Sequence, residues 1–137
     1  MGRPCVLLMA MLVGSVACGT LGEPDRGRVA DGTWGGDHIR LAVTATSATT
    51  EYDCAHGTID QPLMADRDGR LSVTGTHTFE HGGPIRVDES ADRHPARYEG
   101  RLIDDTLQLT VTITDTQQTL GTFTVKRGAA PRLLKCL

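Results

Sequence analysis

Apolar and polar residues alternate along most of the chain after residue 32, which is typical of β-strands that bury one face. The clearest run is residues 107–113, where every odd position is apolar: Leu107, Leu109, Val111 and Ile113. The same period of two marks residues 33–44, 50–54, 71–79, 96–102 and 123–125. No stretch of useful length has the period of a helix, so the pattern predicts eight or nine short strands.

Short polar segments that favour turns separate these runs. Asp68-Gly69 is typical of a two-residue hairpin turn, and Asp104-Asp105 and residues 115–118 are turn candidates between the later strands. Leu134 and Cys136 are predicted to form a last strand. Short connections favour antiparallel pairing of successive strands, either in a barrel or in a sandwich. Closure removes exposed strand edges, so we expect an all-β fold over residues 32–137: a small antiparallel meander barrel of about eight strands with one disulfide.

The stretch from Glu80 to Pro95 has no apolar period and is the longest such segment after residue 32. Long loops in small domains are often functional or mobile. It is therefore the predicted recognition loop, in which the residues of interest are Glu80, His81, Gly82, Gly83, Pro84, Arg86, Arg93 and His94.

The first residues have the features of a lipoprotein signal peptide. An apolar run at residues 6–13 is too short for a permanent membrane span, and small residues precede Cys18. We expect cleavage after residue 17, acyl chains such as palmitate on Cys18, and a flexible tether over residues 18–31. Ser15 stands where Leu is commoner, so ordinary cleavage without lipidation is the alternative.

This leader predicts export to the bacterial cell envelope, where the lipid would anchor the protein in a membrane. Gly19, rather than Asp, follows the lipidated cysteine and favours the outer membrane or the cell surface. Cys5 leaves with the leader and Cys18 carries the lipid. In an oxidising compartment the remaining pair, Cys54 and Cys136, predicts a disulfide, with two free thiols as the alternative.

Composition excludes some partners. The formal net charge is −3 and basic residues form no run, which argues against nucleic acid as a partner. We expect a monomer whose partner is an unknown protein or a small ligand. The five histidines lack metal-ligand spacing, although His77 and His81 would be the best pair, so we predict no metal and no cofactor.

Standard catalytic and nucleotide-binding motifs are absent from the sequence. Asp53, His56 and Asp60 are the best acid–base cluster, but His56-Gly57 is typical of a turn and Asp53 alternates with Cys54. We therefore predict that the protein is not an enzyme.

A pocket inside the barrel is a further candidate site, lined by Trp34, Tyr52, His77 and Tyr98. Eight strands enclose an interior that either packs solid or holds one small ligand. Trp34 either floors such a pocket or plugs one end of the core.

Several short strings resemble a set of short, uncharacterised bacterial lipoproteins, and the likeness covers nearly all of the mature chain. The strings are Trp34-Gly35-Gly36-Asp37-His38, Asp53-Cys54-Ala55-His56-Gly57, Gly82-Gly83-Pro84, Ala96-Arg97-Tyr98-Glu99-Gly100 and Lys135-Cys136-Leu137. This resemblance implies no known activity.

A second, fold-level resemblance is to lipocalin-like barrels and to the membrane-bound inhibitors of animal-type lysozyme. The local motif is Tyr52-Asp53-Cys54 with Gly57 after it. Those inhibitors are small lipoproteins with an eight-stranded barrel and a disulfide that reaches the C-terminal strand. We expect a lipid-anchored, non-enzymatic binding module. The alternatives are a carrier of a small apolar ligand in the barrel interior and an inhibitor of a cell-wall hydrolase such as lysozyme.

Overall fold

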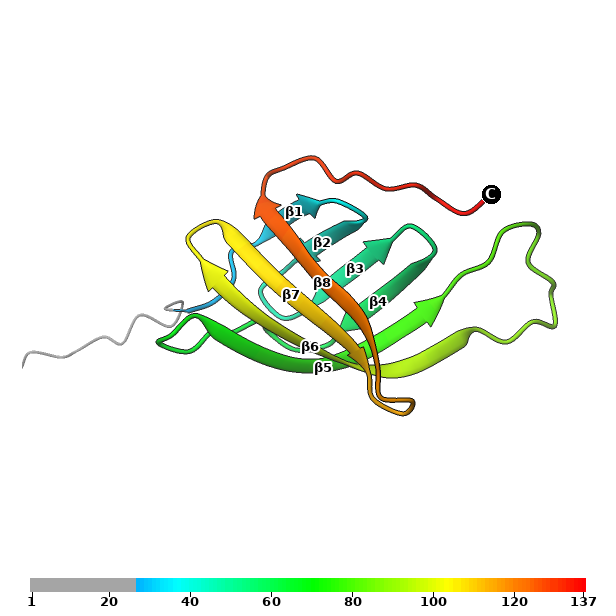
Figure 1. Cartoon of the computed structure of the whole chain (residues 1–137), viewed down its shortest axis with the longest axis horizontal. Coiled ribbons are helices and arrows are strands. Elements are labelled where there is room, and N and C mark those ends of the chain that lie inside the picture. Colours follow the sequence, from blue (N-terminus) through cyan, green and yellow to red (C-terminus); the bar gives the residue numbers. More distant parts are fainter. Residues whose placement is uncertain (1–26) are drawn as a thin grey trace, which may run out of the picture.

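Eight antiparallel strands form a closed barrel in the computed structural model, which describes residues 27–137 (Figure 1). Each strand pairs with the next along the chain, and β8 returns to pair with β1. The strands are β1 (Gly32–Gly36), β2 (Ile39–Val43), β3 (Ala48–Tyr52), β4 (Ala55–Ile59), β5 (Arg70–Phe79), β6 (Asp92–Ile103), β7 (Thr106–Ile113) and β8 (Gln118–Arg127). The predicted meander barrel is confirmed, as is its disulfide. The predicted signal peptide and Cys18 lie outside the described residues.

The turn residues lie where the chain reverses. Asp104 and Gln117 have positive φ values in the β6–β7 and β7–β8 turns, as predicted for these segments. An additional reversal at Asp37–His38, where His38 has φ 65°, divides the predicted run of residues 33–44 into β1 and β2. His56-Gly57 is not a turn as predicted, because the pair lies within β4 and the chain turns instead at Asp53-Cys54.

One predicted strand, at Leu134 and Cys136, is absent from the barrel, and residues 61–65 add no strand to it either. Residues 61–65 contribute one isolated bridge, between Met64 and Arg28, so the Asp68-Gly69 turn does not join two neighbouring strands. Residues 134–136 are not a strand either. Pairing of β1 with β8 closes the sheet, so the last residues find no free edge beside β8 and run across the outside instead.

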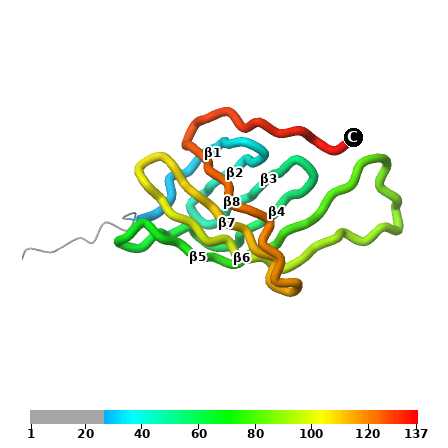
Figure 2. The backbone as a smooth tube through the Cα atoms, viewed as in Figure 1, coloured from blue at the N-terminus to red at the C-terminus, as the bar shows by residue number. Residues whose placement is uncertain are grey.

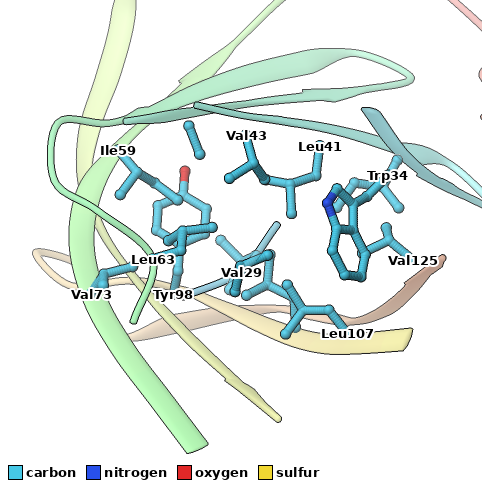
Figure 3. Close-up of a cluster of buried hydrophobic side chains, with 14 of the residues drawn as sticks. Val29, Trp34, Leu41, Val43, Ile59, Leu63, Val73, Tyr98, Leu107 and Val125 are labelled. Carbon is cyan, nitrogen blue, oxygen red and sulfur yellow. The ribbon is translucent and has the colours of Figure 1, made fainter. Parts of the chain in front are cut away.

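The core consists of the inward-facing side chains of all eight strands. Alternation in β7 buries Leu107, Leu109, Val111 and Ile113, as the sequence pattern predicts. Figure 3 shows this cluster, with Val29 between Trp34 and Tyr98. Val29 is fully buried although it precedes β1, so the packed domain begins before the predicted boundary at residue 32.

The last ten residues, 128–137, form a C-terminal strap that crosses the end of the barrel (Figure 2). The Arg132 amide donates to Gly36 O at 3.0 Å, and the Leu134 amide donates to Asp53 Oδ1 at 2.8 Å. Cys136 is bonded to Cys54, with a Cα–Cα distance of 5.3 Å. The strap is therefore held at both ends of its path over the barrel.

Loss of the disulfide is expected to lower the free energy of unfolding by about 2–5 kcal/mol, because the bond closes a long loop in the unfolded chain. The Cys54→Ala, Cys136→Ala double variant tests this by urea denaturation monitored by Trp34 fluorescence. Reduced wild-type protein is the matched control and should show the same loss. A loss below about 1 kcal/mol in both would contradict this estimate.

Candidate recognition site

A cavity of about 610 Å³ lies outside the barrel, between three parts of the chain. One wall is the outer face of β3, β4 and β5, the second is the β5–β6 loop (residues 80–91), and the third is the strap. The residues lining it are Glu51, His56, Thr78, Phe79, Glu80, His81, Gly83, Ile85, Glu89, Ser90, Ala91, Asp92, Lys135 and Cys136. We refer to this space as the loop–strap cavity.

The β5–β6 loop lies beyond the end of the barrel (Figure 1). On one side, β4 pairs with β5 as far as the loop, with Ala55 opposite Phe79. On the other side, β6 begins at Asp92, four residues before Ala96 pairs with Ile113 of β7. The loop therefore protrudes from the body of the protein.

The predicted recognition loop is shorter than the sequence suggested. Arg93, His94 and Pro95 belong to β6, where they pair with Thr78, His77 and Thr76. The apolar period that would mark a strand is missing there because the polar residues 92–94 lie in the protruding part of the hairpin. The remaining predicted loop residues, Glu80, His81, Gly82, Gly83, Pro84 and Arg86, do lie in the loop.

Apolar side chains stand exposed on the loop. Ile85 is 79% exposed and Val87 is fully exposed. Gly82 lies against the end of the chain, because a Cβ atom added there would be only 1.9 Å from Leu137 O. The fully exposed Leu137 side chain is thus carried close to the loop.

Lys135 connects the strap to the barrel and to the loop. Its Nζ lies 2.9 Å from Glu51 Oε1 and 3.7 Å from Glu80 Oε2, and donates to Tyr52 O at 2.9 Å. The hydrogen bond from Lys135 lowers the pKa of Glu51 below its ordinary value, against the effect of burial. All three walls of the cavity therefore meet at one ammonium group.

Four histidines around this end of the barrel face carboxylates. His38 Nδ1 lies 2.6 Å from Asp53 Oδ2, and His56 Nδ1 lies 3.2 Å from Glu80 Oε1. The two other histidines, His81 and His94, have acceptors at both ring nitrogens. An imidazole can donate from both nitrogens only when it is protonated.

The two histidines with hydrogen-bond acceptors at both ring nitrogens, His81 and His94, stabilise different segments. His81 Nδ1 lies 2.8 Å from Gly82 O, and His81 Nε2 faces the Glu89 carboxylate. The hydrogen bond to the Gly82 carbonyl is the main cause that raises the pKa of His81, and the bond to Glu89 adds to it. His94 lies 2.8 Å from Asp115 and 2.9 Å from Asp92, and these hydrogen bonds raise its pKa. His81 thus links the start of the β5–β6 loop to its far end.

The predicted acid–base cluster is not assembled. Asp53 faces His38 and accepts the Leu134 amide, while His56 faces Glu80. Nor do His77 and His81 form a pair, because His77 is buried in the barrel interior. Within residues 27–137, no group of three or more His, Cys, Asp or Glu side chains is arranged to hold a metal ion.

The four predicted pocket residues are all buried: Trp34, Tyr52, His77 and Tyr98. Trp34 packs in the core and donates from Nε1 to Ala30 O at 2.9 Å. Tyr52 and His77 belong to a row of ring contacts at the barrel end near the loop, in which Phe123 also touches Tyr52 and Phe79 also touches His77. These four residues therefore lie in the barrel interior, and a pocket lined by them stays a prediction.

Glu51, Glu89 and Lys135 were not predicted as site residues. Lys135 is adjacent to Cys136, so the predicted disulfide already indicated that it would lie near Tyr52-Asp53-Cys54. Its contacts with Glu51 and Glu80 depend on the path of the strap, for which the sequence carries no pattern.

The chain matches no family model, no curated protein and no solved structure at a significant level. Among the described residues there is no helix of the length and hydropathy needed to span a membrane.

The β5–β6 loop is expected to be held most firmly between about pH 4.5 and 6.5. The raised pKa of His81 means that its contribution is complete below its ordinary value of 6.5 and is lost as pH rises through the higher folded value. The lowered pKa of Glu89 means that its contribution is complete above 4.5 and is lost as pH falls through the lower folded value.

An NMR titration tests this by following the His81 ring and the exchange protection of the Arg86 amide, which donates to Glu89. Protection should fall as pH rises from 6 towards 8.5. The His81→Gln variant should lack this change, and His38→Gln, which removes a pair outside the loop, should retain it. A pKa of His81 at or below 6.5 would show that the contact does not hold the loop.

Proposed function

We propose that this protein is a lipid-anchored, non-enzymatic binding module of the bacterial cell envelope that recognises a protein partner at the loop–strap cavity. The observation that carries the proposal is the cavity itself, whose walls come from a protruding loop, a disulfide-linked strap and the barrel surface.

The chemistry of the cavity suits a protein surface. Ile85, which lines the cavity, and Val87, two residues further along the loop, offer exposed apolar anchors. Glu51, Glu80 and Lys135 form a polar rim with its charges already paired. Protein interfaces commonly combine a few apolar anchors with a polar rim. Covalent attachment of the strap reduces the entropy lost on binding, because one wall is already in place.

The position of the cavity suits an anchored protein. Gly27 lies beside Ala65, near the beginning of β5, whereas the β5–β6 loop follows the other end of that strand. Ten strand residues span about 33 Å. A lipid on Cys18 would therefore place the membrane on the side where the chain enters, with the recognition loop directed away from it.

An inhibitor of a cell-wall hydrolase such as lysozyme is a more specific form of the same proposal. A loop that protrudes beyond the barrel can enter the substrate cleft of such an enzyme, and the exposed Ile85 and Val87 would be its leading side chains. Titration of the protein into a lysozyme lysis assay separates this form from recognition of a different partner.

The proposal that the protein is not an enzyme rests on how its reactive groups are used. Cys54 and Cys136, the two cysteines within residues 27–137, are consumed by the disulfide and cannot act as nucleophiles.

The double variant Ile85→Ser, Val87→Ser is expected to lose at least tenfold in affinity for the partner, because it removes both apolar anchors of the loop. Stability should change by less than about 0.5 kcal/mol, because both side chains are exposed. The partner is captured from envelope extracts, identified, purified and then titrated by calorimetry against each variant.

Ile103→Ser is the matched control, since Ile103 is also exposed but lies next to the β6–β7 turn. It should bind the partner as the wild type does. Equal loss in both variants, or full binding by the loop variant, would show that recognition occurs elsewhere.

A further inference from the structure

A groove of about 450 Å³ lies on the outside of strands β5, β6 and β7 and shares no lining residue with the loop–strap cavity. We refer to it as the outer groove. It forms where β5 begins and β6 ends, at the end of the molecule opposite the β5–β6 loop (Figure 1). The described chain also enters here, because the Ala65 amide, next to Asp66 of the groove, donates to Gly27 O at 2.7 Å.

Two arginines face each other in the outer groove. Arg70 on β5 is the register partner of Arg101 on β6, and both residues are exposed. Like charges that lie directly opposite each other destabilise an antiparallel pair of strands. Among the residues that the structure describes, neither guanidinium group has a carboxylate partner or a hydrogen-bond acceptor. The register of the sheet thus holds two unneutralised positive charges side by side.

The two carboxylates that line the groove are engaged elsewhere. Asp66 Oδ1 accepts the backbone amides of Asp68 and Arg70 at 2.9 Å and 3.0 Å. Glu99 Oε1 lies 3.9 Å from Nη1 of Arg97, a residue outside the groove. Their remaining oxygen lone pairs can accept hydrogen bonds from a ligand, while the arginine pair still needs an anion.

The donors of the groove match a phosphate group better than a carboxylate. Guanidinium groups bind oxyanions through two parallel hydrogen bonds. One such contact occupies both oxygens of a carboxylate, whereas a phosphate monoester has three free oxygens and a charge near −2. Side chains directly opposite in a sheet have Cβ atoms about 5 Å apart, so both arginines can reach one phosphate. The Ser72 hydroxyl and the Gln108 amide are further donors in the groove.

We propose that the outer groove binds the phosphate monoester of a hydroxylated small molecule, with Arg70 and Arg101 holding the phosphate. Asp66 and Glu99 then accept hydrogen bonds from the hydroxyl groups of the ester. The ester is either free in solution or the headgroup of a phospholipid, since both carry the same phosphate chemistry. The headgroup source rests on the proposed lipid anchor, which would place this end of the barrel towards a membrane. The outer groove can fail as a site while recognition at the loop–strap cavity stands.

An NMR titration with glycerol 3-phosphate tests the site through the amide shifts of Ser72 and Gln108. Binding should saturate and should weaken with added salt, because the contact is ionic and lies at the surface. Arg101→Gln should lower the affinity by about tenfold or more, because it removes charge-assisted hydrogen bonds. Arg93→Gln is the matched control and should bind as the wild type does. It removes the same charge from an exposed position of the same strand, outside the groove.

Dihexanoyl phosphatidic acid, kept below its micelle concentration, distinguishes the two sources. Tighter binding of this lipid than of glycerol 3-phosphate names a lipid headgroup, and equal or weaker binding names a soluble ester. Acetate and glycerol at the same concentrations should leave the shifts unchanged. The proposal is overturned if neither phosphate probe gives a saturable shift, if acetate binds as well as they do, or if both arginine variants lose affinity equally.

Discussion

The bond between Cys54 and Cys136 joins two parts of the chain that the strand ladders leave separate. The barrel closes through the pairing of β1 with β8, and the residues after β8 add no strand to it. Without the disulfide, the strap would be held by a few hydrogen bonds, chiefly to Gly36, Asp53 and Tyr52, and by the ion pairs of Arg132 and Lys135. These bonds lie near the surface, where water competes for the same groups. The covalent link therefore fixes the path of the strap over the barrel end.

The position of the strap then determines what the β5–β6 loop can form. β6 begins at Asp92, four residues before Ala96 pairs with Ile113 of β7, and the β5–β6 loop would otherwise be a free projection. With the strap in place, Leu137 lies against Gly82, and Lys135 reaches both Glu51 and Glu80. A cavity forms between surfaces that are distant in sequence, on the side away from the entry of the chain. The proposed recognition function depends on this arrangement.

The sequence predicted the barrel well, because strict alternation in residues 107–113 and turn residues such as Asp104 act locally. It predicted the disulfide because the cysteine count left one pair. It failed where local pattern and tertiary context disagree. His56-Gly57 is typical of a turn, but Gly57 lies within β4, where only a residue without a side chain leaves room for the Tyr98 hydroxyl.

The candidate site was less accessible to prediction than the fold. The sequence predicts the β5–β6 loop but places its end at Pro95, whereas β6 begins at Asp92. The difference arises because the first residues of β6 are polar on both faces of the strand. The loop–strap cavity depends on ladder length and on the path of residues 128–137, which have no periodic pattern.

Photo-crosslinking in the native envelope tests the central claim most directly. A photoreactive amino acid at position 85 reports on the loop, and the same amino acid at position 103 reports on an exposed site at the other end of β6. The account predicts one discrete protein adduct from position 85, its loss in the Cys54→Ala, Cys136→Ala background, and no adduct of that mass from position 103. The same adduct from both positions, or an adduct from position 103 alone, would contradict recognition at the loop–strap cavity.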